Sequence, residues 1–317
     1  MKFYASVTDQ NWFDYLKAQT SIDEVNFWQP SPNDQFRALK RGELYLFKLH
    51  RSPRTRNKDI IAGGGIFASY TTLPFSLMWE TFEDRNGART SAELRKQLLG
   101  YKKVPVSPQE DFLVGCIILT QPFFFDESLW FPVPSWSKSI VRGKGYDLIT
   151  ADGQIIWKSL EQVWQKTRVF NLDKEAQRID AKKDRYGKDT IIRPRLGQGA
   201  FRVIVTDAYH RACAITEEHS LPALEASHIK PYNESGEHEV NNGLLLRSDF
   251  HRLFDHGYIT ITPDYRIEIS RRLKEEFENG HSYYPFHGHS LTHFPDRPED
   301  RPSKELLIWH NESIFKG

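Results

Sequence analysis

The stretch 228–255 contains four side chains that together could form a reaction centre: His228, Asn242, His251 and Asp255. His251 and Asp255 are four residues apart, so on a helix they would share one face. An imidazole and a carboxylate on one face can anchor a divalent cation and leave coordination positions open for water and phosphate. The spacing therefore predicts a cation site on a helix.

His228 and Asn242 precede this expected helix and would serve it differently. We expect His228 at the end of a strand over 224–229, where it could face the cation without binding it, as a general base should. Asn242 comes before Gly243 at a turn, and its amide could hydrogen-bond to backbone across the loop and hold the His228 strand in place. Taken singly, such residues are more often structural, and an exposed His–Asp pair adds little stability. The prediction therefore depends on all four occurring in this order.

The elements that must position these side chains can be predicted from the local sequence. The helix that carries His251 should have Ser248 or Asp249 near its N-cap and should end before Gly257. Around it we expect a helix over 201–213, a hairpin over 257–270 and a closing helix over 302–315.

Four segments carry a resemblance to a known family: CAIT (213–216), ASHIKPY (226–232), NGLLLRSDFHRLFDHG (242–257) and RPSKELLIWH (301–310). They resemble the HNH endonucleases over about residues 195–317. The resemblance implies the ββα-metal fold, in which two strands and a helix surround one divalent metal. It also implies hydrolysis of DNA phosphodiesters by a water molecule.

The resemblance assigns a role to each of the four residues. It implies that His228 is the base that activates water, that Asn242 is the middle Asn and that His251 is a metal ligand. Asp255 stands where the family often has a second ligand on the helix. These roles predict that removing the metal abolishes nearly all activity.

The chain departs from the family pattern just before the base. The family often has a metal-binding Asp or His there, whereas this chain has Ser227. Ser227, Glu225, a water or a phosphate oxygen is then left to fill the third metal position. We expect Mg²⁺ or Mn²⁺ as the cofactor, and no structural zinc because the chain lacks the Cys pairs that hold one. The four histidines of 281–294 could suggest zinc, but Pro and Gly interrupt them and a loop or phosphate contact is more ordinary.

The two halves of the 317-residue chain differ in composition, which favours two domains. Eleven of the twelve histidines lie at or after position 210, whereas seven of the eight tryptophans come before position 165. The first half should be mostly β, a small barrel, with strands over 42–50, 59–70 and 112–125 and a short helix over 91–101. We place the domains at 1–165 and 197–317, joined by a charged linker over 166–196 that is a solvated helix or a phosphate-contacting connector.

The first half also contains aromatic residues that could line a pocket: Phe27, Trp28, Tyr70 and Trp79. For any one Trp, a place in the core is the better interpretation. A triple Gly at 63–65 nevertheless allows a ligand to approach the backbone closely, and flat aromatic walls suit a flat ring.

The segments FWQPS (27–31), GELYLFKLH (42–50) and 61–88 resemble the EVE domains of the PUA-like superfamily, over about residues 1–160. This resemblance implies a reader that flips a modified base into an aromatic pocket, with stacking restored by the protein. Four basic residues could hold the flanking phosphates: Arg51, Arg54, Arg56 and Lys58.

The complete expectation is an α+β protein with an N-terminal PUA-like/EVE β-barrel and a C-terminal HNH ββα-metal domain. The pair resembles type IV-like, modification-dependent restriction endonucleases, which cut double-stranded DNA that carries 5-methyl or 5-hydroxymethyl cytosine. Because one active site cuts one strand, we expect a homodimer or paired binding of two copies. Two alternatives are a sequence-specific or unselective HNH nuclease and a reader of modified DNA or RNA that does not cleave.

Composition excludes several other classes. The net charge of +1 means that any nucleic-acid surface must come from local charge segregation. Two cysteines without a CxxC pair indicate a reducing cytoplasm rather than a disulfide framework. We expect no signal segment and no membrane span, because no apolar run reaches about 18 residues.

Overall fold

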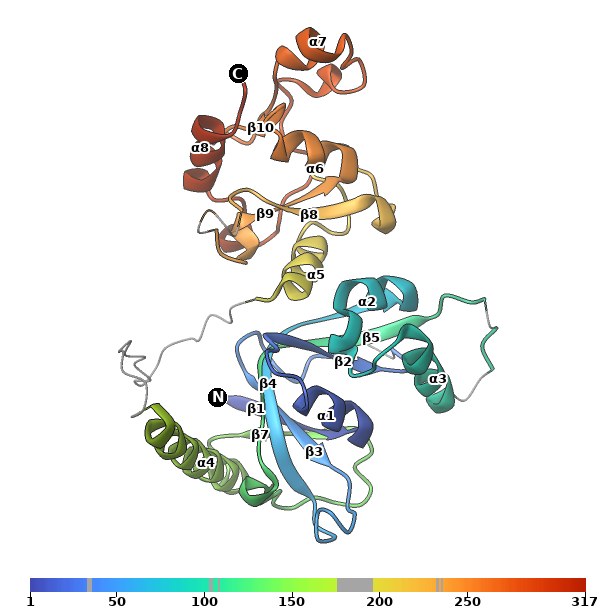
Figure 1. Ribbon diagram of the computed structural model, residues 1–317, viewed down its shortest axis with the longest axis vertical. Coiled ribbons are helices and arrows are strands. Elements are labelled where there is room, and N and C mark those ends of the chain that lie inside the picture. The colour runs from blue at the N-terminus through green and yellow to red at the C-terminus, as the bar shows by residue number, and fades with distance from the viewer. Residues whose placement is uncertain (33–35, 103–104, 108, 176–195, 232–233, 235) are drawn as a thin grey trace. The chain divides into compact units, whose positions relative to one another are not determined.

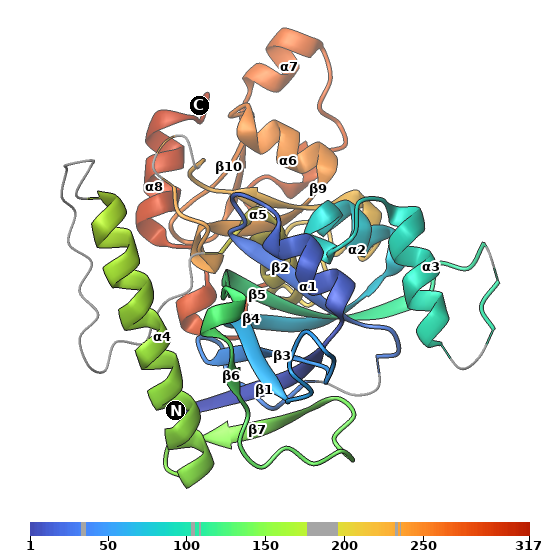
Figure 2. The same ribbon diagram turned by 60° about the horizontal axis from the view of Figure 1, so that its bottom comes forward.

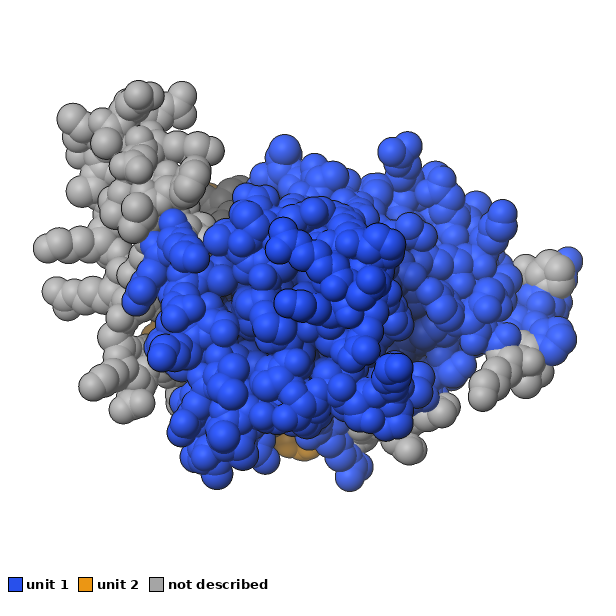
Figure 3. Space-filling model, turned by 90° about the horizontal axis from the view of Figure 1, so that it is seen from below, with its two compact units in different colours: residues 1–194 blue, residues 195–317 orange. Residues whose placement is uncertain are grey.

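The computed structural model describes residues 1–32, 36–102, 105–107, 109–175, 196–231, 234 and 236–317, with the side chains of 167–175 left out. Contacts divide the chain into two compact units, Met1–Pro194 and Arg195–Gly317, which have different colours in Figure 3. The predicted linker 166–196 begins inside helix α4 (Ala151–Glu175), and 176–195 lie outside the described residues.

The first unit is built on a mixed sheet with strand order β2-β5-β4-β3-β1-β7, and β6 pairs with β4 (Figures 1 and 2). The pair β1–β3 is parallel and the other pairs are antiparallel. The strands are β1 (Lys2–Thr8), β2 (Glu24–Gln29), β3 (Leu44–Leu49), β4 (Ile60–Pro74), β5 (Leu113–Phe124), β6 (Phe131–Pro132) and β7 (Gly143–Asp147).

The predicted strands over 42–50, 59–70 and 112–125 are confirmed as β3, β4 and β5. A closed barrel is not shown, because the sheet path of the described residues ends at β2 on one side and at β7 on the other. The coarser expectation of a mixed α+β protein holds.

Helices cover parts of this sheet. The helices are α1 (Gln10–Lys17), α2 (Phe75–Phe82), α3 (Ser91–Tyr101) and α4. Trp12, Phe13 and Leu16 bury the inner face of α1. Ile156 and Leu160 of α4 join an apolar cluster that includes Tyr146 of β7, and α4 lies beside β7 (Figure 2). Apolar residues three or four positions apart place each helix on its buried face.

The predicted helix over 91–101 is confirmed as α3, with one difference at each end. The N-cap is Thr90 rather than Ser91, and its side chain accepts a hydrogen bond from the backbone N–H of Glu93 (3.2 Å). Gly100 does not end the helix, which continues through Tyr101. A glycine without the left-handed conformation does not act as a stop.

The second unit contains two short antiparallel hairpins and four helices among its described residues. The elements are α5 (Gln198–Ala208), β8 (Leu224–His228), β9 (Gly243–Arg247), α6 (Ser248–Asp255), β10 (Ile259–Ile261), β11 (Ile267–Ile269), α7 (Arg272–Phe277) and α8 (Lys304–Ser313). The predicted strand over 224–229 is β8, the hairpin over 257–270 is β10–β11 and the closing helix is α8. The helix expected over 201–213 starts earlier and ends at Ala208.

The α6 helix begins at Ser248 directly after β9, so the residue before its first turn is Arg247 rather than Ser248 or Asp249. Gly257 follows the helix with φ +73°, a conformation that favours glycine. A Cβ on Gly257 would lie 2.0 Å from the backbone O of Ile314, so the C-terminal segment packs against this glycine. These contacts fix the end of the helix that carries His251.

No helix within the described residues is long and apolar enough to cross a membrane.

Candidate active site

Strands β8 and β9 place His228 and Asn242 at the same end of a hairpin. His228 is the last residue of β8 and lies opposite Gly243, the first residue of β9. Asn242 is 1% exposed, and its side chain binds the backbone of the loop between the strands. Its Oδ1 accepts from Lys230 N–H (2.9 Å), and its Nδ2 donates to the carbonyls of Lys230 (2.9 Å) and Glu237 (2.9 Å). Asn242 thereby holds both ends of the loop that follows His228.

His251 lies on α6 between two carboxylates. Its Nδ1 is 2.5 Å from Glu225 Oε2 on β8, and its Nε2 is 3.2 Å from Asp255 Oδ2 one helical turn later. Burial lowers the pKa of His251, but hydrogen bonds to Asp255 and Glu225 outweigh it and raise the pKa above its usual value. The imidazole of His251 thus connects α6 with Glu225 of β8.

His228 packs face to face on Phe201 of α5, with ring centroids 3.9 Å apart and an interplanar angle of 9°. Its Nε2 lies 2.9 Å from Nδ1 of His238, a residue of the same loop. Burial, followed by the charges of His238 and His251, lowers the pKa of His228 to about 4, while the charge of Asp255 opposes this shift. His228 is therefore neutral at pH 7, and the charges of His251 and Asp255 act on it.

Ser227 is fully buried, and its Oγ has no hydrogen-bond partner within the described residues. It shares a face of β8 with Glu225, because alternate strand residues point the same way. An unpartnered buried hydroxyl is unusual and is a feature that a ligand or water can satisfy. Its predicted part in metal binding stays a prediction.

The donor set fits a divalent cation that needs few protein ligands. No group of three or more His, Cys, Asp or Glu that could hold a metal ion is found in the part of the chain that the structure describes. His251 Nε2 and Asp255 Oδ2 are nevertheless 3.2 Å apart, so both atoms could bind the same ion. Such an ion keeps several waters and takes phosphate oxygens from its substrate. Glu225, bound to the opposite nitrogen, would then orient the imidazole from outside the coordination shell.

Comparison with protein families agrees with this geometry. Residues 213–262 match the model of a family described as HNH endonuclease, and the match includes His228, Asn242, His251 and Asp255. This segment is an HNH endonuclease domain. No curated protein matches the chain. HNH nucleases generally use a divalent metal, and the match supports nuclease activity on DNA.

The four aromatic residues predicted to line a base pocket lie in different surroundings. Phe27 and Trp28 are successive residues of β2, so their side chains point to opposite faces of the sheet. Phe27 packs on Trp12, with centroids 5.2 Å apart, while Trp28 Nε1 donates to the backbone O of Asn86 (3.0 Å). Both are less than a tenth exposed, as core residues are.

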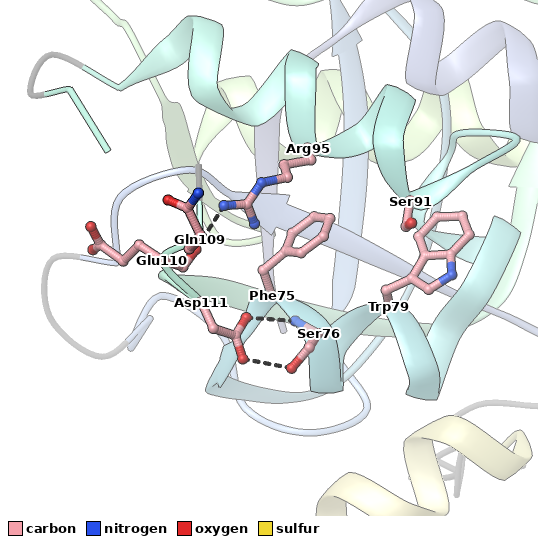
Figure 4. A pocket seen from close by; sticks show the side chains of 8 residues that line it. All are labelled: Phe75, Ser76, Trp79, Ser91, Arg95, Gln109, Glu110 and Asp111. Atoms are coloured by element: carbon pink, nitrogen blue, oxygen red, sulfur yellow. Dashed lines mark hydrogen bonds between the residues drawn. The ribbon is translucent and has the colours of Figure 1, made fainter. Parts of the chain in front are cut away.

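Tyr70 and Trp79 complete that set and also lie apart. The ring of Tyr70 is 6.4 Å from that of Phe36, and its buried Oη has no hydrogen-bond partner within the described residues. Trp79 of α2 is half-buried and lines a cavity of about 430 Å³ together with Phe75 (Figure 4). Trp79 is therefore the member of the four predicted pocket residues that lines this cavity.

Polar groups from α2, from α3 and from the segment before β5 complete the cavity: Ser76, Ser91, Arg95, Gln109, Glu110 and Asp111 (Figure 4). Asp111 accepts from the N–H (2.8 Å) and the hydroxyl (2.6 Å) of Ser76 at the start of α2. Arg95 lies over Phe75 and donates to the carbonyl of Glu110 (2.7 Å). Two aromatic rings thus form one part of the cavity lining, and these polar residues, its polar wall, form the rest.

The predicted phosphate-contacting residues differ in their availability. Arg51 pairs with Asp59, and Arg54 pairs with Asp14 and Glu127. Arg56 and Lys58 are exposed on the same loop. Two carboxylates therefore neutralise the charge of Arg54, whereas Arg51 shares Asp59 with the buried Lys48.

Two residues of the site were missed from the sequence, namely Phe201 and His238. Phe201 lies in the predicted helix over 201–213 and is buried, but the sequence does not show that it contacts His228. His238 lies in a loop whose path depends on the hydrogen bonds of Asn242. Only the closed loop brings it to His228.

Proposed function

We propose that this chain is a metal-dependent deoxyribonuclease whose second unit hydrolyses DNA phosphodiesters. The observation that carries the proposal is the arrangement of a neutral His228 at the end of β8 beside an α6 helix that presents His251 and Asp255. One group can take a proton, and the other two can hold a cation. This combination suits hydrolysis of a phosphodiester.

The residues divide the work as follows. His228, neutral at pH 7, takes a proton from the attacking water. Asn242 fixes the loop after His228, so that the imidazole keeps its direction. His251 Nε2 and Asp255 would hold Mg²⁺ or Mn²⁺, while Glu225 orients His251. When bound, the cation supplies positive charge that stabilises the charged phosphate and the leaving 3′ oxygen.

A digestion series tests this function. Matched duplexes that are unmodified, methylated or hydroxymethylated at cytosine are incubated with the full chain in Mg²⁺, in Mn²⁺ and in EDTA. We expect cleavage in the metal buffers and none in EDTA. Retained DNA binding without cleavage of any duplex would favour the alternative, a reader that does not cut.

We further propose that the first unit selects DNA with modified cytosine. The cavity lined by Trp79 and Phe75 supports this proposal, because its volume of about 430 Å³ lies in the range of small-ligand pockets. A flipped base could stack on the indole, and the polar wall could bind the edge of the base. Phe27 and Trp28 are assigned to the core instead.

A substitution in the cavity tests this selection. We expect Trp79→Ala to lower the preference for modified DNA while the unselective rate stays unchanged, because Trp79 belongs to the first unit. Trp157→Ala in α4 is a matched control, since this half-buried indole lies outside the cavity. Equal cutting of all three duplexes by the unaltered chain would reject selection by modification and favour an unselective nuclease.

We also propose that two copies act together on a duplex, because one nuclease site per chain cuts one strand. A supercoiled plasmid distinguishes the two outcomes. Paired copies give linear DNA at a rate that rises steeply with protein concentration. Single copies give nicked circles that accumulate in proportion to protein.

A further inference from the structure

Three rings meet behind the predicted reaction centre. Phe201 covers one face of the His228 imidazole, and the ring centroid of His238 lies 4.9 Å from that of His228 and 5.7 Å from that of Phe201. His228 is therefore held on one face and at one edge. The edge contact joins two ring nitrogens, His228 Nε2 and His238 Nδ1, at 2.9 Å.

A hydrogen bond between two imidazole nitrogens contains one proton, and its position decides which nitrogen of His228 is basic. If His238 Nδ1–H donates, the Nε2 lone pair of His228 is occupied and its Nδ1 carries the ring proton. His228 could then accept no proton from water. If His228 Nε2–H donates, the Nδ1 lone pair of His228 stays available. Only the second arrangement leaves His228 able to act as a base.

We propose that His238 is a positioning residue that accepts a hydrogen bond from His228 Nε2–H and so leaves the His228 Nδ1 lone pair to take the proton of the attacking water. The inference rests on the proposed nuclease function. In the step, one O–H bond of water breaks and its proton moves to His228 Nδ1. The oxygen electron pair forms the new O–P bond, and the 3′ oxygen leaves with the electrons of the broken P–O bond and is protonated by solvent.

The loop geometry explains why His238 lies within hydrogen-bond distance of His228. Asn242 binds Lys230, two residues after His228, and Glu237, one residue before His238. The same amide thus fixes the chain next to each of the two histidines. After proton transfer His228 is an imidazolium, and its Nε2–H bond to His238 becomes charge-assisted and stronger. His238 therefore supports the charged form that the reaction creates.

Two substitutions test the inference. His238→Ala removes the acceptor, whereas His238→Asn retains an oxygen acceptor near the position of Nδ1. We expect kcat of the Ala variant to fall ~10–100-fold with an unchanged KM for DNA, because the base loses its orientation rather than its substrate. The Asn variant should recover most of that loss. His281→Ala, at an exposed histidine of the same unit, is the control and should cut like the unaltered chain.

A second measurement does not depend on cleavage. In the full chain with ¹⁵N-labelled histidine, long-range ¹H–¹⁵N NMR spectra report which ring nitrogen of His228 carries the proton. We expect the Nε2–H form, and a mixture of both forms in His238→Ala. A His228 protonated at Nδ1, or an Ala variant with unchanged kcat, would overturn the inference. If the unaltered chain cuts no DNA, the proposed function fails and the NMR result alone decides the direction of the hydrogen bond.

Discussion

Asn242 forms two hydrogen bonds with the backbone of Lys230, accepting from its N–H (2.9 Å) and donating to its carbonyl (2.9 Å). A side-chain amide matches a peptide group in this way, so it can replace the strand pairing that the loop interrupts. The Asn that the family resemblance placed between the two histidines thus has a positional role. It keeps the His228 end of β8 and the loop together.

The first prediction concerns this amide. Asn242→Ala should lower the free energy of unfolding by about 1–3 kcal/mol, because partly buried backbone groups of Lys230 and Glu237 lose their partners. Cleavage should fall as well, since His228 loses its direction. Chemical denaturation and single-turnover cleavage measure the two effects. Asn242→Asp is the comparison variant, because it keeps the oxygen acceptor. An Asn242→Ala variant as stable and as active as the unaltered chain would contradict the positional role.

The second prediction separates the two carboxylates around His251. Asp255→Asn should raise the Mg²⁺ concentration at half-maximal cleavage, because Asp255 would contact the ion directly. Glu225→Gln should weaken metal binding ~10–100-fold, as loss of an orienting carboxylate does, and added Mg²⁺ should restore its rate. Metal titrations of the cleavage rate measure both effects. Identical titration curves for both variants and the unaltered chain would remove these residues from the metal site.

The third prediction follows from the raised pKa of His251. Glu225 and Asp255 stabilise the imidazolium against the opposing effect of burial, so below this raised pKa a cation must displace a proton from the ring. Affinity for Mn²⁺ should therefore fall about tenfold per pH unit as the pH drops below that pKa, and should level off above it. Isothermal titration calorimetry between pH 6 and 8 measures the slope. His251→Gln should flatten it, and an unchanged slope in that variant would assign the proton elsewhere.

The fourth prediction concerns stability in acid. Burial lowers the pKa of His310 to about 4 from the usual 6.5, despite its hydrogen bond to the backbone O of Phe254. The folded protein therefore holds His310 neutral, while the unfolded chain takes up a proton below pH 6.5. Proton uptake by the unfolded chain lowers the free energy of unfolding by about 3 kcal/mol as the pH falls from 6.5 toward 4. This stability is fully present above pH 6.5.

Denaturation of the full chain in EDTA at pH 7 and at pH 5 measures this loss. His310→Gln should be less stable at pH 7, because His310 is 2% exposed and also contacts Thr260 (2.8 Å). It should, however, lose less stability between the two pH values. Equal losses in both proteins would show that His310 does not titrate in this range. His228, whose pKa is also about 4, adds to the acid sensitivity of both proteins equally.

Much of the nuclease hairpin could be predicted because its chemistry is local. Four-residue spacing placed His251 and Asp255 on one helix, and a short β-rich run placed His228 at a strand end. These predictions needed only helix and strand periodicity. The contact between His228 and His238 could not be predicted, because it depends on how Asn242 closes a loop.

The aromatic residues of the first half show where sequence reasoning loses its information. Phe27 and Trp28 are adjacent, and strand alternation already implies that they face opposite sides of the sheet. The sequence could not show which side holds the core, and both sides of β2 are buried. Nor could the sequence show whether the sheet closes into a barrel, because closure depends on pairing between strands far apart in the chain.

The most direct test of the central claim is the single-turnover cleavage rate of His228→Ala on duplex DNA in Mg²⁺ and in Mn²⁺, measured together with DNA affinity. Because His228 lies against Phe201 at the end of β8 and contributes no predicted metal ligand, the variant should bind DNA like the unaltered chain. We predict that it cuts at least ~100-fold more slowly. Cleavage at the unaltered rate by a folded His228→Ala variant would contradict the account.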